Sequence, residues 1–73
     1  MANSTRYVLK WTNIFSGESG YVASVRKSKG YFENSWELDG AKTYISESLA
    51  KRDIDTLVEL GEAENNRFEI IEK

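Results

Sequence analysis

The chain of 73 residues contains no histidine, no cysteine and no proline. Without histidine and cysteine it lacks the commonest general base, the commonest nucleophile and the soft metal ligands, and it can form no disulfide. A nucleophilic site would have to use a Ser–Lys arrangement or a pair of carboxylates. These absences predict a protein that is not an enzyme and that has neither a metal site nor a cofactor site.

The carboxylates of the sequence do not supply the missing pair. Glu33 and Glu37 share one face of a predicted strand, but they stand four positions apart, roughly 13 Å at strand rise, which is too far for glycosidase-type chemistry. Asp53 and Asp55 lie two apart on a predicted helix and point in different directions. The serine- and glycine-rich stretch 16–20 lacks the Lys-Ser/Thr of a phosphate-binding loop. We therefore expect no catalytic residue.

Length and composition indicate one small globular domain over residues 1–73, with residues 1–5 expected to be disordered. Apolar residues make up 40% and charged residues 30% of the chain, as in ordinary soluble proteins. No stretch approaches the roughly 20 apolar residues that span a bilayer, and the first residues contain no apolar segment typical of a secretory signal. We expect a cytoplasmic protein without a membrane partner.

Residue patterns predict four strands and one helix. Alternating apolar and polar residues indicate strands at Arg6–Thr12, Tyr21–Lys27, Tyr31–Leu38 and Arg67–Glu72. Between Ser46 and Leu60 the apolar residues recur with helical period, Ser46 suits the N-cap, and Gly61 suits the position after the C-cap. The expected fold is α+β, in the order βββαβ: a three- to four-stranded, mostly antiparallel sheet with the helix on one face. A crossover around the helix would pair the last strand in parallel with the first.

Strict alternation also assigns the two faces of the sheet. The face under the helix is expected to collect Tyr7, Leu9, Trp11, Tyr21, Ala23, Val25, Phe32, Trp36, Leu38, Phe68 and Ile70. The other face is expected to carry interleaved charges, with Val8, Val22, Tyr31 and Ile71 among them. Asp53 falls within the apolar arc of the helix, where an unpaired carboxylate is costly. It should lie at the solvent edge, pair with a cation such as Lys51 or Arg67, or mark an irregular helix, and we favour the edge.

Charge is unevenly distributed, which suggests one candidate binding surface. Residues 1–36 carry a net charge of +3 and residues 37–73 a net charge of −5. A predicted hairpin tip combines cations with a ring, as single-stranded nucleic-acid sites do, and its residues are Arg26, Lys27, Lys29 and Tyr31, assisted by Arg6 and Lys10. The pI of about 5.1 and the acidic second half oppose a long polyanion. Nucleic-acid binding is therefore the alternative hypothesis.

Aromatic residues point to a different partner. The chain has two Trp, four Tyr and three Phe, and one short helix can hardly cover both tryptophans, Phe15, Tyr31 and Tyr44 together with the aliphatic residues. Grouped exposed rings mark interaction surfaces. The preferred function is a non-enzymatic module that binds another protein or forms a homodimer. The competing interpretation is that these rings fill a small core and shield its ends.

Several segments carry a resemblance to a known group of proteins. They are Tyr7–Trp11, Gly30–Asn34, Ala41–Tyr44 ahead of the helix, and the ending Phe68–Ile71. Together they resemble small uncharacterised proteins encoded by bacteriophages and prophages of Gram-positive bacteria. The resemblance implies a cytoplasmic accessory protein of a phage or mobile element, and it carries over no catalytic residue.

Overall fold

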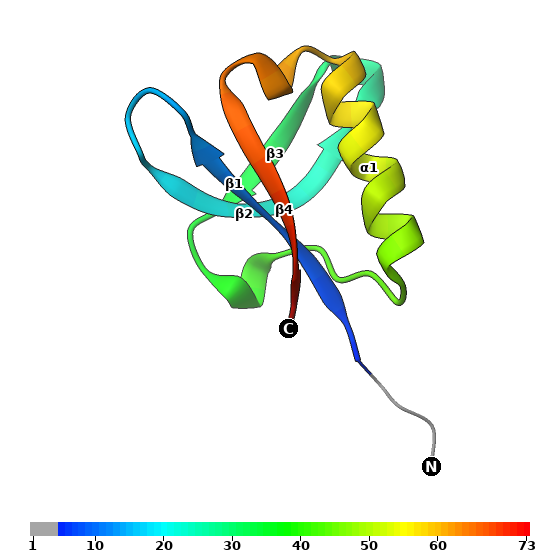
Figure 1. The fold of residues 1–73 in the computed structure, drawn as a ribbon. Helices are drawn as coiled ribbons and strands as arrows, with labels where there is room; N and C mark the ends of the chain where they lie inside the picture. Colours follow the sequence, from blue (N-terminus) through cyan, green and yellow to red (C-terminus); the bar gives the residue numbers. More distant parts are fainter. Residues whose placement is uncertain (1–4) are drawn as a thin grey trace.

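The computed structural model describes residues 5–73 (Figure 1). The expectation of disorder for residues 1–4 lies outside the described residues, and Thr5 is partly buried. The elements are β1 (Tyr7–Asn13), β2 (Ser19–Arg26), β3 (Tyr31–Ser35), α1 (Glu47–Glu59) and β4 (Asn66–Glu72). Single turns of 3-10 helix, η1 (Lys27–Lys29), η2 (Leu38–Gly40) and η3 (Glu62–Glu64), occupy the connections. The α+β class and the βββαβ order are confirmed.

The strands form one sheet in the order β3-β2-β1-β4, with every neighbouring pair antiparallel. The predicted parallel pairing of β1 with β4 is wrong, because Tyr7 lies opposite Glu72 and Asn13 opposite Asn66. The third strand is also shorter than predicted and ends at Ser35. There the Ser35 hydroxyl donates to the Glu37 carbonyl at 2.7 Å and accepts from the Glu37 amide at 3.2 Å, which turns the chain.

The length of α1 explains why β4 runs antiparallel to β1. Tyr44, just before the helix, pairs with Tyr7 at the start of β1, and Asn65, after the helix, accepts from Ile14 beyond the end of β1. The 13 residues of α1 span about 20 Å, close to the roughly 23 Å of the seven-residue β1. The helix thus carries the chain along β1 to its far end, and β4 can only return in the opposite direction.

Helix α1 begins and ends as its sequence predicts. The Ser46 hydroxyl accepts a hydrogen bond from the Leu49 amide at 3.3 Å, and Glu47 lies in the first turn, where a negative charge suits the helix dipole. Gly61 follows the C-cap Leu60 with φ +84°, a conformation that favours glycine. The buried side of the helix presents Ala50 and Leu57, both fully inaccessible to solvent.

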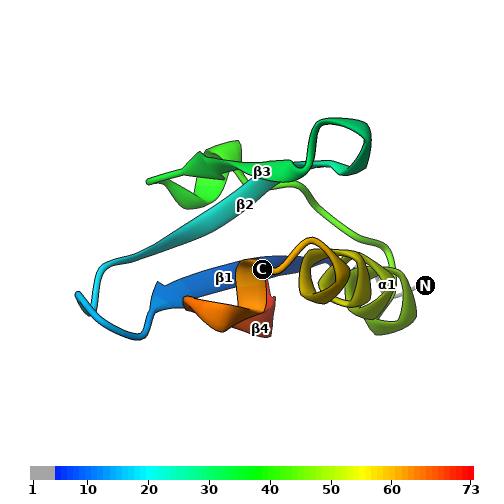
Figure 2. The same cartoon turned by 90° about the horizontal axis from the view of Figure 1, so that it is seen from above.

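The sheet is strongly coiled. Viewed from above, β3 and β2 form one layer and β1 and β4 another, with α1 beside the second layer (Figure 2). The outermost strands β3 and β4 meet through their side chains, since the Phe32 and Phe68 ring centroids lie 5.6 Å apart. The core between the layers and the helix is built from Leu9, Trp11, Val22, Tyr44, Ala50 and Leu57.

A β-bulge in β2 changes which of its side chains share a face, so the alternation predicted for this strand is wrong. Val22 pairs with Asn34 and Ser24 with Glu33, so Ala23 is an extra residue on β2. A bulge shifts the side-chain alternation by one position. Val22, assigned to the charged face, is fully buried in the core, whereas Val25, beyond the bulge, packs on the core as predicted. Val8, also assigned to the charged face, is fully buried too.

Candidate functional site

The first candidate surface is the tip of the β2–β3 hairpin. Arg26 and Tyr31 face each other across the two strands, and η1 with Gly30 at φ +81° connects them. All of these side chains are exposed. The structure therefore brings together four predicted site residues, which we call the basic tip: Arg26, Lys27, Lys29 and Tyr31.

The charge of the basic tip is partly neutralised by Glu33. Its carboxylate accepts from the Ser24 hydroxyl at 2.7 Å and pairs with the Arg26 guanidinium at 3.3 Å. The Ser24 hydrogen bond first, and then the charge of Arg26, lower the pKa of Glu33 below its ordinary value of 4.5. Glu33 thus remains ionised at neutral pH and would repel a phosphate that approached Arg26.

Arg6 and Lys10, the other two predicted site residues, lie elsewhere on the sheet. Lys10 is opposite Tyr21 on one side and Glu69 on the other. Tyr21 is five residues from Arg26 along β2, roughly 16 Å at strand rise. Arg6 immediately precedes β1, and its carbonyl accepts from the Lys73 amide, which follows β4, at 2.8 Å. The six predicted residues do not form one surface.

The second candidate surface is a group of rings contributed by β1, β3, β4 and the segment after β3. Trp11 packs edge-to-face on Trp36 at 5.7 Å between ring centroids and on Phe32 at 6.4 Å, and Phe32 packs on Phe68 at 5.6 Å. Trp11 is 8% exposed, whereas Trp36 is 66% exposed. We call this group the aromatic cluster: Trp11, Phe32, Trp36 and Phe68.

Two neighbours hold Trp11 in place beneath Trp36. The Trp11 indole N–H donates to the Asn34 side-chain oxygen at 2.6 Å. Gly20 lies opposite Trp11 on β2, and a Cβ there would lie 2.5 Å from the Asn34 Oδ1 and 2.9 Å from the Trp11 Nε1. Only glycine leaves room for this hydrogen bond. The buried half of the aromatic cluster is therefore fixed, and the exposed ring of Trp36 rests on a rigid base.

Of the aromatic rings that the sequence suggested were too many for the core, some are buried and others lie on the surface. Trp11 and Tyr44 are buried, at 8% and 4% exposure. Trp36, Phe15 and Tyr31 are exposed, together with five aliphatic residues: Ile14, Leu38, Ile45, Leu49 and Val58. Part of the surplus therefore fills the core, and another part lies on the surface, where a partner could cover it.

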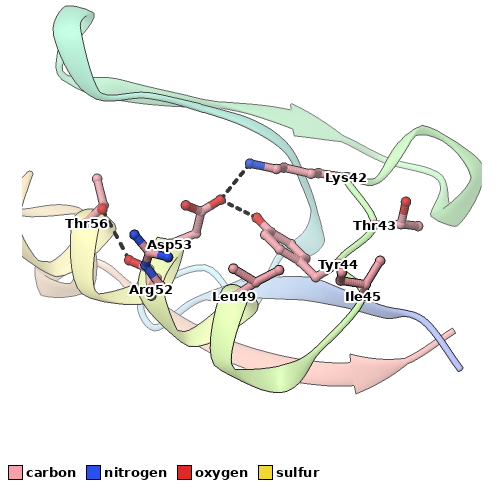
Figure 3. A pocket seen from close by; sticks show the side chains of 8 residues that line it. All are labelled: Lys42, Thr43, Tyr44, Ile45, Leu49, Arg52, Asp53 and Thr56. Carbon is pink, nitrogen blue, oxygen red and sulfur yellow. Dashed lines mark hydrogen bonds and ion pairs between the residues drawn. The ribbon is translucent and has the colours of Figure 1, made fainter.

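A third feature, absent from the sequence predictions, is a hollow of about 490 Å³ between residues 42–45 and one side of α1 (Figure 3). We call it the α1 hollow, and it is lined by Lys42, Thr43, Tyr44, Ile45, Leu49, Arg52, Asp53 and Thr56. Residues 42–44 lie where β2 leaves β1: the Lys42 amide donates to the Val22 carbonyl of β2, and Tyr44 exchanges hydrogen bonds with Tyr7 of β1.

Asp53 on α1 accepts hydrogen bonds from two residues on the other side of the α1 hollow. One carboxylate oxygen accepts from the Tyr44 hydroxyl at 2.5 Å and from the Lys42 ammonium at 2.9 Å. The side chain of Asp53 is 23% exposed, so it lies at the edge, as favoured, and is also paired. Its cation is Lys42, not Lys51 or Arg67. In the sequence, the position of Asp53 within the apolar arc of the helix was a sign of these contacts. Its partners Lys42 and Tyr44 lie in the segment before the helix, whose position helical periodicity does not predict.

Within residues 5–73 the structure contains no group of three or more acidic side chains arranged to hold a metal ion. The same residues include no helix with the length and apolar character required to cross a membrane. Comparison with known proteins returns no matching family model, no matching curated protein and no matching solved structure.

Proposed function

We propose that this chain is a non-enzymatic protein-binding module whose contact surface is the aromatic cluster. The observation that carries the proposal is the position of Trp36, whose ring is 66% exposed and rests on the buried ring of Trp11. Tryptophan is enriched among the residues that dominate binding energy, especially on a well-packed base. A large apolar ring left in water gains most from being covered by a partner.

The base of the aromatic cluster supports binding because it needs no rearrangement. Trp11 is held by Asn34 at 2.6 Å, and Phe32 is held between Trp11 and Phe68. A preorganised surface loses little conformational entropy when a partner covers it. Trp36 is the exposed member of the cluster, and its side chain has few rotatable bonds to immobilise on binding.

The first partner to test is a second copy of the chain. A two-fold axis brings the same surface of both copies together, so each Trp36 can pack on the aromatic cluster of the other copy. The net charge of −2 gives only weak repulsion between copies at physiological salt. A heterologous protein partner is the other form of the same proposal.

Sedimentation equilibrium tests self-association through Trp36. We expect the average mass of the wild type to rise above 8.4 kDa as concentration increases toward several hundred micromolar. Trp36→Ser should weaken the dimer by roughly tenfold or more, because hot-spot residues contribute at least about 2 kcal/mol. Phe15→Ser is the matched control, since Phe15 is an exposed ring outside the aromatic cluster. A wild type that stays at 8.4 kDa would leave only a heterologous partner, and equal effects of the two variants would exclude the aromatic cluster.

The rival function, single-stranded nucleic-acid binding, depends on the basic tip. Arg26 is paired with Glu33, and Arg6 and Lys10 lie on other parts of the sheet. That leaves Lys27 and Lys29, and about two phosphate contacts give little affinity. We expect a fluorescence titration with a labelled oligonucleotide at ~50 mM salt to show no binding. Binding that disappears in a Lys27→Glu, Lys29→Glu double variant would establish the rival function.

We place this module in the cytoplasm, as an accessory protein of a phage or mobile element. The absence of cysteine suits a reducing compartment, where disulfides do not persist. The resemblance of Tyr7–Trp11 and Gly30–Asn34 to phage-encoded proteins supports the same setting. Neighbouring genes for replication, lysis or packaging would identify the process in which the module takes part.

A further inference from the structure

The outer edge of β4 is a feature that the proposed function does not use. β3 and β4 are the two edge strands of the sheet. Proteins protect such edges with short strands, β-bulges or proline. β3 has five residues and pairs with β2 across the bulge, whereas β4 pairs with β1 over seven consecutive residues without a register shift and contains no proline. β4 is therefore the edge that is open to a further strand.

The backbone groups of alternate β4 residues point to the free edge. On the side of β1 away from β4, Tyr7 exchanges hydrogen bonds with Tyr44, whereas the carbonyl of its neighbour Arg6 accepts from the Lys73 amide. Successive residues of an antiparallel strand bond to opposite sides, so the odd-numbered residues of β4 bond to β1 and the even-numbered residues face outward. The outward-facing backbone groups form no hydrogen bond within residues 5–73, and they belong to Asn66, Phe68, Ile70 and Glu72.

The free edge of β4 is accessible. None of its seven residues is buried, and Arg67, Glu69 and Glu72 are exposed. β4 crosses in front of β1 in Figure 1, and no other element covers it from that side. Arg67 and Glu69 belong to no ion pair within residues 5–73. Their charges are therefore available to a strand that pairs with this edge.

The order of charges along β4 makes its free edge complementary to the same edge of a second copy. In an antiparallel pair, Arg67 and Glu69 would fall in the positions without hydrogen bonds, where facing side chains approach most closely. A two-fold axis at Phe68 places Arg67 of each copy opposite Glu69 of the other, which is favourable. The same register pairs Asn66 with Ile70 and Phe68 with Phe68, and it yields about six backbone hydrogen bonds.

Other positions of the two-fold axis are less favourable. An axis at Arg67 or at Glu69 would place two like charges directly opposite each other, which destabilises a strand pair. An axis at Ile70 would place Arg67 opposite Lys73, again two like charges. An axis at Ile71 would place the apolar Ile70 opposite the charged Glu72.

We propose that β4 pairs with β4 of a second copy, antiparallel and about a two-fold axis at Phe68, so that two four-stranded sheets become one continuous sheet. Backbone hydrogen bonds hold the two strands together, and the charges of Arg67 and Glu69 select the register. The interface lies at the opposite edge of the sheet from β3, which leads into Trp36. It does not use the exposed ring of Trp36 and so goes beyond the proposed function.

Sedimentation equilibrium of the Trp36→Ser variant tests this interface without the contact through the aromatic cluster. We expect the average mass to rise above that of one chain as the concentration increases toward several hundred micromolar. Across that range, hydrogen exchange followed by NMR should slow several-fold at the amides of Phe68 and Ile70, because they then donate to the second copy. A mass that stays at one chain, or a dimer in which these amides exchange as fast as in the monomer, would overturn the proposal. Because Trp36 is already replaced, either result is independent of the proposed function.

Charge reversals on β4 test the register in the same background. Arg67→Glu and Glu69→Arg should each weaken the dimer about tenfold or more, because each turns two attractive cross-strand pairs into two repulsive pairs. An equimolar mixture of the two variants should restore association, since every pair between positions 67 and 69 of the mixed dimer then joins an acid to a base. Restoration would also show that both variants are folded. Glu59→Arg, the matched control, makes the same charge change on the exposed surface of α1 and should leave the dimer unchanged. A mixture that associates no better than either variant alone, or a control as weak as Glu69→Arg, would contradict the proposal.

Discussion

Trp11→Ala is expected to lower the free energy of unfolding by about 3–5 kcal/mol, the usual cost of removing a buried tryptophan. The ring is 8% exposed and contacts both Phe32 and Trp36, so its loss opens a cavity under the aromatic cluster. It also deprives Asn34 of its donor at 2.6 Å. At roughly 0.05–0.15 kcal/mol per residue, a domain of 73 residues has only about 4–11 kcal/mol of stability. The substitution should therefore remove a large part of the stability of the domain.

Chemical denaturation measures this effect, with Trp36→Ala as the control. Trp36 is the same residue type in the same aromatic cluster, but two-thirds of its surface is already exposed. Its removal should cost about 1 kcal/mol or less, because an exposed side chain loses little on unfolding. A stable Trp11→Ala variant, or equal losses for the two tryptophans, would mean that the aromatic cluster is not anchored as the structure indicates. The contrast also separates two roles: stabilisation of the fold by Trp11 and, in the proposed function, contact with a partner by Trp36.

The parts of the fold that the sequence predicts well are those specified by neighbours along the chain. The start of α1 depends on the Ser46 hydroxyl and the Leu49 amide, three residues apart. Its end depends on the left-handed conformation of Gly61. Such local signals need no knowledge of the rest of the molecule. The direction of β4 was mispredicted because it depends on the match between the lengths of α1 and β1, which alternation does not contain.

The face of β2 was mispredicted for a different reason. The extra residue Ala23 reverses the side-chain alternation of β2, and the sequence Tyr21–Val25 gives no sign of a bulge. The candidate surfaces also differ in how far the local sequence indicates them. Counting rings against the area one helix can cover predicted a surplus of rings, but the alternation placed Trp36 on the face under the helix, and its 66% exposure corrects that assignment. The α1 hollow was not predicted, because it forms where residues 42–44 replace β2 beside β1, a tertiary event that places Lys42 next to Asp53.

The burial of Tyr44 and its hydrogen bond to Asp53 also make the free energy of unfolding change with pH in the alkaline range. Burial first, and then the hydrogen bond and charge of Asp53, raise the pKa of Tyr44 above its ordinary value of 10.0. Above pH 10 the unfolded chain loses the Tyr44 proton while the folded chain keeps it. Stability should therefore fall as pH rises, by up to about 1.4 kcal/mol per pH unit. A Tyr44→Phe variant should lack this part of the decline, which denaturation curves between pH 9 and about 11 would measure.

Asp53→Ala is expected to lower the free energy of unfolding by about 2–3 kcal/mol, because it removes the acceptor of a buried hydroxyl. Tyr44 is 4% exposed, and no other side chain in residues 5–73 accepts from its hydroxyl. The Lys42 pair adds little, since the Lys42 side chain is 44% exposed. In a Tyr44→Phe background the same change should cost about 1 kcal/mol or less, because no buried hydroxyl then needs an acceptor. Denaturation of the two single variants and the double variant measures the difference. Equal costs in the two backgrounds would show that Asp53 stabilises the fold through Lys42 and not through the hydroxyl of Tyr44.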